Sequence, residues 1–265
     1  EIIYMAYKMD YLTDVILRLD FSVNCEDIKT ELKTDIQSVI ANYFPIPEKR
    51  STELQQVISS ANDPDKKELT IKTEKIIEWH YFGKNREKEL VITSNYIYIL
   101  IKKYNSFDIL KKEFFDIVGA LVKIYTDIKF NRIGLRYIDQ VDLINDKTSR
   151  KNWHTYWSKY INSNLTSGLS FLDDDQKMSR YLSSIEMNYG DFMLRFQYGI
   201  SNPDYPAPNK KQIFILDTDV YSVGLYSIAD VENVISQYHN VAKDWFERSI
   251  KDSLRGKMGV VDGNE

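Results

Sequence analysis

The most regular pattern along the chain is an alternation of apolar and polar residues over residues 131–143. One side carries the apolar set, interrupted by Asp139: Ile133, Leu135, Tyr137, Val141 and Leu143. The other side carries Arg132, Gly134, Arg136, Ile138, Gln140 and Asp142. A period of two is typical of a strand with one apolar face. Because the alternation is long for one strand, we expect it to lie centrally in a sheet and to bend at Gly134.

Shorter alternations predict further strands on both sides of this segment. The expected strands are residues 15–23, 54–59, 69–82, 89–93, 96–103, 180–189, 192–200 and 212–217. Apolar residues at three- and four-residue steps predict three long helices, which begin at Asn24, at Asn105 and Ser106, and at Asp230. Residues 153–161 predict a shorter, aromatic-rich helical segment. Pro45 and Pro47 are expected to end the first helix.

The predicted elements follow the order strand, helix, strands, helix, and then repeat it. This order favours an α+β protein with two lobes, each an antiparallel sheet backed by helices. We place the lobes at residues 1–130 and 131–265, and we expect the long strand at residues 131–143 to contribute to both sheets. The repeated order predicts an ancient duplication of one β-α-β-α unit.

The composition is that of an ordinary globular protein, with 43% hydrophobic and 28% charged residues. The net charge of -4 argues against a surface that binds phosphates all over. The single cysteine, Cys25, excludes an internal disulfide and predicts a reducing cytoplasm. No stretch reaches the ~20 apolar residues that cross a bilayer, and the N-terminus lacks the basic flank of a signal peptide. We therefore expect no membrane association.

Three segments are similar to one protein family. Residues 132–137 read Arg-Ile-Gly-Leu-Arg-Tyr, which resembles the signature of a sporadically distributed bacterial and archaeal family of uncharacterised proteins of about this length. The strand at residues 14–21 and the helix at residues 245–255 resemble the same family. The resemblance implies no settled activity. The patchy distribution of that family implies a link to phage-defence or mobile-element genes.

The candidate binding residues lie in the same central segment. Arg132 and Arg136 share its polar face, roughly 13 Å apart along an extended chain. Two guanidinium groups on one face suit phosphates or carboxylates, although a carboxylate elsewhere in the fold would hold them equally well. Tyr137 and Gln140 complete the predicted binding set.

A weaker candidate is a divalent-metal site. Asp217 and Asp219 end a predicted strand with both carboxylates on one face, where the acidic residues 173–175 could join them. The three histidines lie far apart in sequence, and neither a zinc spacing nor a phosphate-binding glycine loop is present. We therefore predict no cofactor and no catalytic residue.

These observations favour a non-catalytic binding or scaffolding protein with a protein partner. It would act through the seam between its lobes or through a sheet face. Two other functions stay open. One is an RNA- or DNA-binding accessory factor that uses Arg132, Arg136 and neighbouring aromatics. The other is a metal-dependent hydrolase that uses Asp217 and Asp219.

Overall fold

The protein is built on one antiparallel sheet of nine strands, in the order β2-β3-β4-β5-β1-β6-β9-β8-β7. The computed structural model describes residues 7–59, 69–143, 152–172, 177–208 and 213–259. The strands are β1 (Leu12–Phe21), β2 (Ile46–Ser59), β3 (Leu69–Phe82), β4 (Lys88–Ile92), β5 (Tyr96–Ile101), β6 (Phe130–Asp142), β7 (Tyr181–Asn188), β8 (Met193–Ser201) and β9 (Ile213–Tyr226). The predicted α+β class is thus confirmed.

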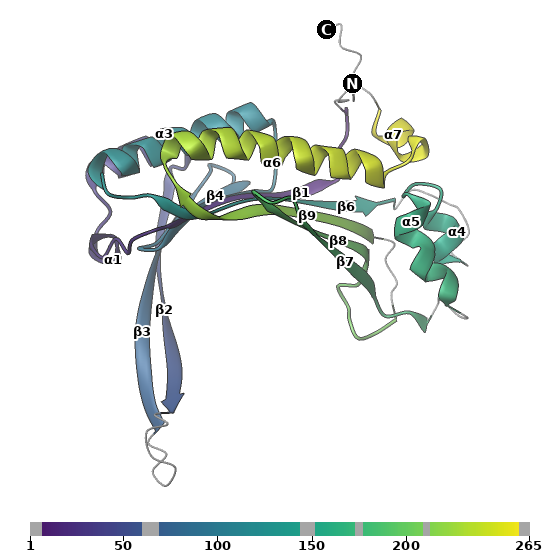
Figure 1. Ribbon diagram of the computed structural model, residues 1–265, viewed down its shortest axis with the longest axis horizontal. Helices are drawn as coiled ribbons and strands as arrows, with labels where there is room; N and C mark the ends of the chain where they lie inside the picture. The colour runs from purple at the N-terminus through teal and green to yellow at the C-terminus, as the bar shows by residue number, and fades with distance from the viewer. Residues whose placement is uncertain (1–6, 60–68, 144–151, 173–176, 209–212, 260–265) are drawn as a thin grey trace, which may run out of the picture.

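Helices cover one face of this sheet and leave the other uncovered (Figure 1). The long helices are α3 (Phe107–Ile124) and α6 (Ile228–Ser249); the short ones are α1 (Asp27–Thr30), α2 (Thr34–Tyr43), α4 (Trp153–Trp157), α5 (Ser163–Thr166) and α7 (Asp252–Met258), with a 3-10 turn, η1 (Ser167–Phe171). The core lies between α3, α6 and the sheet. There the alternating apolar residues of β1 and β6, such as Leu17 and Leu135, are fully buried.

The central strands β1 and β6 join the two halves of the chain. They pair antiparallel from Leu12 opposite Asp139 to Phe21 opposite Phe130, and β6 also pairs with β9. Both halves therefore contribute to one continuous sheet, and β6 contacts a strand of each. Gly134 lies in regular register, so it marks no bulge; the irregular pairings of β6 lie near its two ends, beside Phe130 and opposite Leu12 and Asp14.

Strands β2 and β3 form a long hairpin that projects from the body (Figure 1). They stay paired from Ile46 opposite Phe82 to Ser59 opposite Leu69, whereas β4 pairs with β3 only between Trp79 and Phe82. A 14-residue strand spans about 45 Å. The prediction that this strand begins near residue 54 is wrong. Pro47 fits inside β2 because an edge strand needs no backbone donor on its outer side.

The predicted helix ends need correction. The first helix is broken into α1 and α2, and neither starts at Asn24, whose side chain donates to Glu26 instead. Ser106 caps α3 by accepting a hydrogen bond from the Ile109 amide, as expected. Ser227, not Asp230, caps α6; Asp230 is the reciprocal partner in a capping box.

Strand β9 runs to Tyr226, beyond the predicted end at residue 217. Asp217 and Asp219 therefore lie inside a central strand, and arginines on neighbouring strands make their burial tolerable. Within the described residues, no helix combines the length and apolarity needed to cross a membrane. Burial raises the pKa of the Cys25 thiol to about 11, so this side chain acts as an inert apolar group at neutral pH.

Candidate functional site

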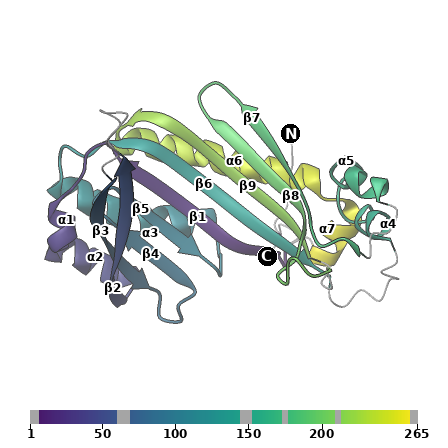
Figure 2. The same cartoon turned by 90° about the horizontal axis from the view of Figure 1, so that it is seen from below.

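The candidate site is the sheet face that the helices do not cover, which we call the open face. Figure 2 shows it from below, with the helices behind the strands. Strand register decides which side chains it carries, because directly paired residues in an antiparallel sheet point to the same side. Arg136 pairs with Ile16 on β1 and with Asp219 on β9, and Asp219 pairs with Arg195 on β8. These side chains therefore share the open face.

Two arginine–aspartate pairs occupy the middle of the open face. Arg136 donates to Asp217 through Nε (2.7 Å to Oδ1) and Nη2 (2.5 Å to Oδ2). Arg195 donates to Asp219 through Nη2 at 3.0 Å. The hydrogen bonds to Asp217 raise the pKa of the Arg136 guanidinium. Burial raises the pKa of the Asp219 carboxyl, although Arg132, Arg195 and Arg136 oppose that effect.

Arg132 lies near the start of β6, opposite Asp20 of β1, and forms no ion pair among the described residues, although its charge acts on Asp219. Its guanidinium carbon lies 5.2 Å from the centre of the Tyr221 ring. Beside it is a shallow hollow of about 370 Å³, lined by Arg18, Arg132, Arg136, Arg195, Tyr98 and Asp219. Arg18 is paired with Asp20 at 2.5 Å and lies over the Tyr96 ring. The hollow thus has one guanidinium charge more than its carboxylates neutralise.

Away from the hollow, the open face carries charged side chains of both signs that contact one another. Nδ1 of His80 lies 2.6 Å from Glu89, and its Nε2 lies 3.3 Å from Glu78, which also accepts from the Tyr96 hydroxyl. Among the side chains that the structure describes and that strand register places on this face, acidic residues outnumber arginines. The acids are Asp14, Asp20, Glu48, Glu78, Glu89, Glu186, Asp217 and Asp219; the arginines are Arg18, Arg50, Arg132, Arg136 and Arg195.

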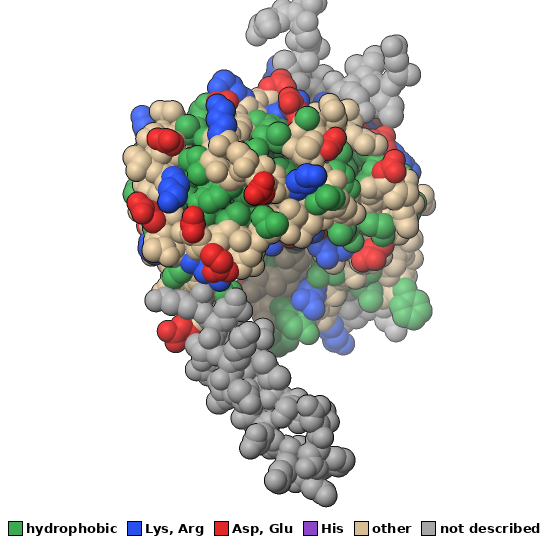
Figure 3. Space-filling view, turned by 60° about the vertical axis from the view of Figure 1, so that its left-hand side comes forward, with side chains coloured by type: hydrophobic (Ala, Val, Ile, Leu, Met, Phe, Trp, Pro, Cys, Tyr) green, Lys and Arg blue, Asp and Glu red, His purple; other side chains and the backbone are tan. Residues whose placement is uncertain are grey.

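Charges of both signs are also interspersed on the surface at the end of the molecule that carries α1 and α2 (Figure 3). No continuous basic stripe is visible in that view. A surface of this kind does not suit the evenly spaced negative charges of a nucleic acid backbone.

The predicted binding residues do not form one group. Arg132 and Arg136 both line the hollow. Gln140 shares their face, but it lies further along β6, where its backbone amide donates to Tyr11. Tyr137 points to the opposite, helix-covered face, where its hydroxyl lies 2.7 Å from Nδ1 of His239. Including Tyr137 in a single site with the arginines was therefore wrong, because consecutive strand residues face opposite sides.

The candidate metal ligands are engaged by arginine. Asp217 and Asp219 share a face, as expected, but each carboxylate accepts hydrogen bonds from a guanidinium. The acidic residues 173–175 lie outside the described residues. Among the described residues, no group of three or more His, Cys, Asp or Glu side chains is placed to hold a metal ion. A divalent cation would have to displace Arg136 and Arg195 from the two aspartates.

Arg18 and Arg195 were not among the predicted site residues, although the sequence held a signal for both. Each occupies a polar position of an alternating strand, as Arg132 and Arg136 do. What the sequence could not supply was the strand order, which brings β1, β6, β9 and β8 side by side. That order places four arginines from three strands around the hollow, and it pairs Arg136 with Asp217 and Arg195 with Asp219.

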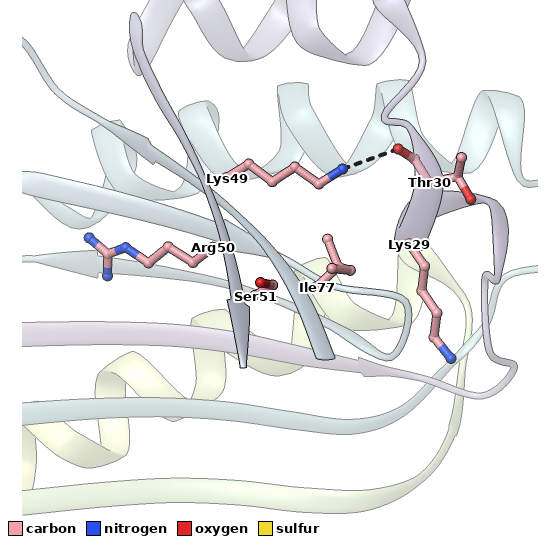
Figure 4. A pocket seen from close by; sticks show the side chains of 6 residues that line it. All are labelled: Lys29, Thr30, Lys49, Arg50, Ser51 and Ile77. Carbon is pink, nitrogen blue, oxygen red and sulfur yellow. Dashed lines mark hydrogen bonds between the residues drawn. The ribbon is translucent and has the colours of Figure 1, made fainter. Parts of the chain in front are cut away.

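A second basic pocket, of about 620 Å³, lies at the root of the hairpin near α1. Its cations do not converge: Lys49 reaches the Thr30 carbonyl oxygen at 3.3 Å, while Arg50 and Lys29 point elsewhere (Figure 4). Arg50 is paired with Glu48 and Lys29 with Glu26, each at 3.0 Å. With its cations dispersed and partnered, this pocket is a weaker candidate than the hollow beside Arg132.

Neither the protein-family models nor the curated protein sequences contain a match to this chain. The resemblance of residues 132–137 to an uncharacterised family therefore stays a prediction.

Proposed function

We propose that this protein is a binding or scaffolding protein that holds a protein partner on the open face of its sheet. The observation that carries the proposal is Arg132, a guanidinium on the uncovered face of the nine-stranded sheet that forms no ion pair among the described residues. Its neighbours Arg136 and Arg195 are already paired, so the hollow can accept one further anionic group. Arginine suits this task because its planar fork binds a carboxylate through two hydrogen bonds.

The occupant that fits best is a protein surface with one Asp or Glu side chain among basic or neutral residues. The carboxylate would bind Arg132 in the hollow. The surrounding face, where acids outnumber arginines, would repel a partner with many negative charges. Tyr98 and Tyr221 flank the hollow and offer flat apolar contacts of the kind found at the centre of protein interfaces.

The two other functions have less support. An RNA- or DNA-binding factor would need a net positive face, and this face carries an acidic excess. A metal-dependent hydrolase would need free carboxylates at Asp217 and Asp219, and both accept from arginines. We keep the nucleic acid as an outcome of the experiment below.

We further propose that the two halves of the chain derive from a duplication and act as two lobes of one binding surface in a reducing cytoplasm. The support is topological: β1 and β6, the first strand of each half, pair antiparallel in the middle of the sheet. A long helix closes each half, α3 in the first and α6 in the second. If the two halves are copies of one unit, each copy supplies one of the two paired strands, β1 and β6, in the middle of the open face.

The proposal can be tested with a displayed library of random peptides selected on the immobilised full chain. We expect the enriched peptides to contain Asp or Glu and to lose roughly tenfold in affinity on Arg132→Ala, which corresponds to one charged hydrogen-bonded contact. Arg248→Ala is the matched control, because this exposed arginine lies on α6, away from the open face. Its affinity for the peptides should equal that of the unchanged protein.

Three results would count against the proposal. The first is enrichment of peptides without acidic residues, and the second is an affinity that Arg132→Ala leaves unchanged. The third is tight binding of labelled single-stranded RNA or DNA that weakens steeply with salt and depends on Arg132, which would favour the nucleic-acid function instead.

A further inference from the structure

A second cavity lies on the opposite, helix-covered side of the sheet. It has a volume of about 370 Å³ and lies between β6, the start of α3 and the second half of α6. Its buried lining residues Asp139 and Thr218 are called its floor here, and its more exposed lining residues Tyr7 and Asp10 are called its mouth. This volume is within the range of pockets that bind small molecules.

Asp139 is the unusual residue of this pocket. It occupies an apolar position of β6, between Tyr137 and Val141, and only 8% of its surface is exposed. Among the described residues, no side chain donates a hydrogen bond to its carboxyl group and no cation pairs with it. Burial and the charges of Asp10 and Asp217 raise its pKa to about 8. An unpartnered acid in such a place is costly unless something else binds it.

Aromatic rings form the walls of the pocket around Asp139. His239 stacks on Phe107 with ring centres 4.1 Å apart and planes 2° from parallel. Tyr104 meets the Tyr137 ring edge-on at 6.0 Å. Burial lowers the pKa of His239 to about 4, so its ring is neutral at pH 7 and adds an aromatic surface without a positive charge. Phe107, Tyr104, Tyr137 and His239 all line the cavity.

From this arrangement we infer that the pocket binds a small organic cation, a protonated amine whose ammonium group is held between Asp139 and Asp10. The carboxylate at the floor pairs with the ammonium, and Asp10 at the mouth adds a second negative charge. The aromatic walls attract the same charge through their ring faces. The hydrocarbon part of the ligand packs between Phe107 and Tyr137.

Other ligand classes fit less well. A divalent metal prefers six or more oxygen ligands, and the described residues place no group of three or more potential metal ligands anywhere. An anion would meet three lining carboxyl groups, Asp10, Asp139 and Glu247, against one lining cation, Lys243, which lies near His239. A neutral apolar ligand would leave Asp139 without a partner. A cation is the ligand class that would stabilise the ionised forms of both Asp139 and Asp10.

Several titratable groups surround Asp139 and bear on the acidity of the site. They are Asp10 on the N-terminal segment, Asp217 on β9, Tyr104 before α3, Tyr137 on β6, and His239, Lys243 and Glu247 on α6. Burial and the neighbouring carboxyl groups of Asp10 and Asp217 favour the protonated form of Asp139 when the pocket is empty. Binding of an ammonium ion stabilises the carboxylate, so the proton is released to the solvent as the cation enters.

The test compares a panel of small ammonium compounds, such as 2-phenylethylammonium, with the matching alcohols and carboxylates, each titrated into the full chain by calorimetry. We expect at least one ammonium compound to bind roughly tenfold more tightly than its alcohol, and Asp139→Asn to abolish that preference. Repeating the titration in buffers of different ionisation enthalpy should show proton release in the unchanged protein and none in Asp139→Asn.

Two further variants keep the test decisive. Asp10→Asn alters an exposed residue at the mouth of the pocket. It should weaken the binding of the ammonium compound without affecting folding. Asp14→Asn is the matched control, because Asp14 lies on the same strand as Leu12 but faces the open side of the sheet. The inference is overturned if no ammonium compound binds, if alcohols or carboxylates bind as tightly, or if the preference survives in Asp139→Asn. None of these results depends on Arg132, so they are independent of the partner proposed for the open face.

Discussion

Arg136 and Asp217 face each other diagonally across the central strands β6 and β9, and two hydrogen bonds of 2.7 and 2.5 Å join them. Asp217 keeps only 10% of its side chain exposed, whereas Arg136 keeps 32%. The pair therefore anchors a carboxylate that the fold places in a buried position. Asp217 could bind a metal ion only if Arg136 moved away from its carboxylate.

Removal of Arg136 should destabilise the protein. We expect Arg136→Ala to lower the free energy of unfolding by about 2 kcal/mol, because Asp217 is left buried without a partner. This expected loss is smaller than the ~3–5 kcal/mol lost when one partner of a fully buried pair is removed, because about a third of the Arg136 side chain is exposed to solvent. Urea denaturation measures the change. Arg248→Ala removes an exposed pair and should have little effect; equal losses in the two variants would contradict the role given to Arg136.

Asp139 should make the protein less stable as the pH rises. Its folded pKa of about 8 lies above the ordinary value of ~3.9, so the folded state binds the proton more tightly than the unfolded state. The contribution of Asp139 to the free energy of unfolding is therefore fully present below about pH 4. It is lost as the pH rises to 8, by up to roughly 1.4 kcal/mol per pH unit. Asp139→Asn should remove this loss. Thermal unfolding at pH 6 and pH 8 measures this loss. If the stability of Asp139→Asn falls as steeply between these pH values as that of the unchanged protein, the prediction is contradicted.

His239 should titrate at unusually low pH because Phe107 covers its ring. We expect an NMR titration to place the pKa of His239 near 4 and Phe107→Ala to move it toward the ordinary ~6.5 as water enters. Phe107→Leu keeps an apolar cover and should leave the pKa low. Because the folded pKa is depressed, the contribution of His239 to stability is present above about pH 6.5 and lost as the pH falls toward 4. An unchanged pKa in Phe107→Ala would show that other contacts bury the ring.

The capping box of α6 predicts a further loss of stability. Ser227 accepts from the Asp230 amide, and Asp230 accepts from the Ser227 amide. Ser227→Ala should lower the free energy of unfolding by about 1 kcal/mol, the usual cost of a lost N-cap. Ser38→Ala, at an exposed position inside α2, is the control and should be neutral or slightly stabilising, because alanine favours helix interiors. Equal destabilisation by both substitutions would rule out a specific effect of the cap.

The sequence predicted those elements whose pattern is local. The alternation of β1 and β6 and the apolar stripe of α3 lie where they were expected. The start of β2 was missed because Pro47 and the charged residues after it are typical of a loop, and only an edge position makes them acceptable in a strand. The end of β9 was missed because Asp217 and Asp219 are neutralised by residues distant in sequence.

The same distinction separates the two candidate sites. Arg132 and Arg136 were predicted because their face follows from the alternation alone. The pocket around Asp139 depends on where α3 and α6 cross the sheet, and periodicity within one strand contains no information about that crossing. A signal was nevertheless present, because Asp139 interrupts the apolar side of the most regular strand in the chain. A charged residue at such a position indicates a polar cavity or a ligand.

The antiparallel pairing of β1 with β6 has a consequence for how the molecule can be divided. A cut near residue 130 would strip the central hydrogen-bond ladder and leave each fragment with a long bare edge of apolar-faced strand. Neither fragment is then expected to fold by itself, and the intact chain should melt in a single cooperative transition. We therefore expect the two halves to fold together as one unit, however similar their order of elements.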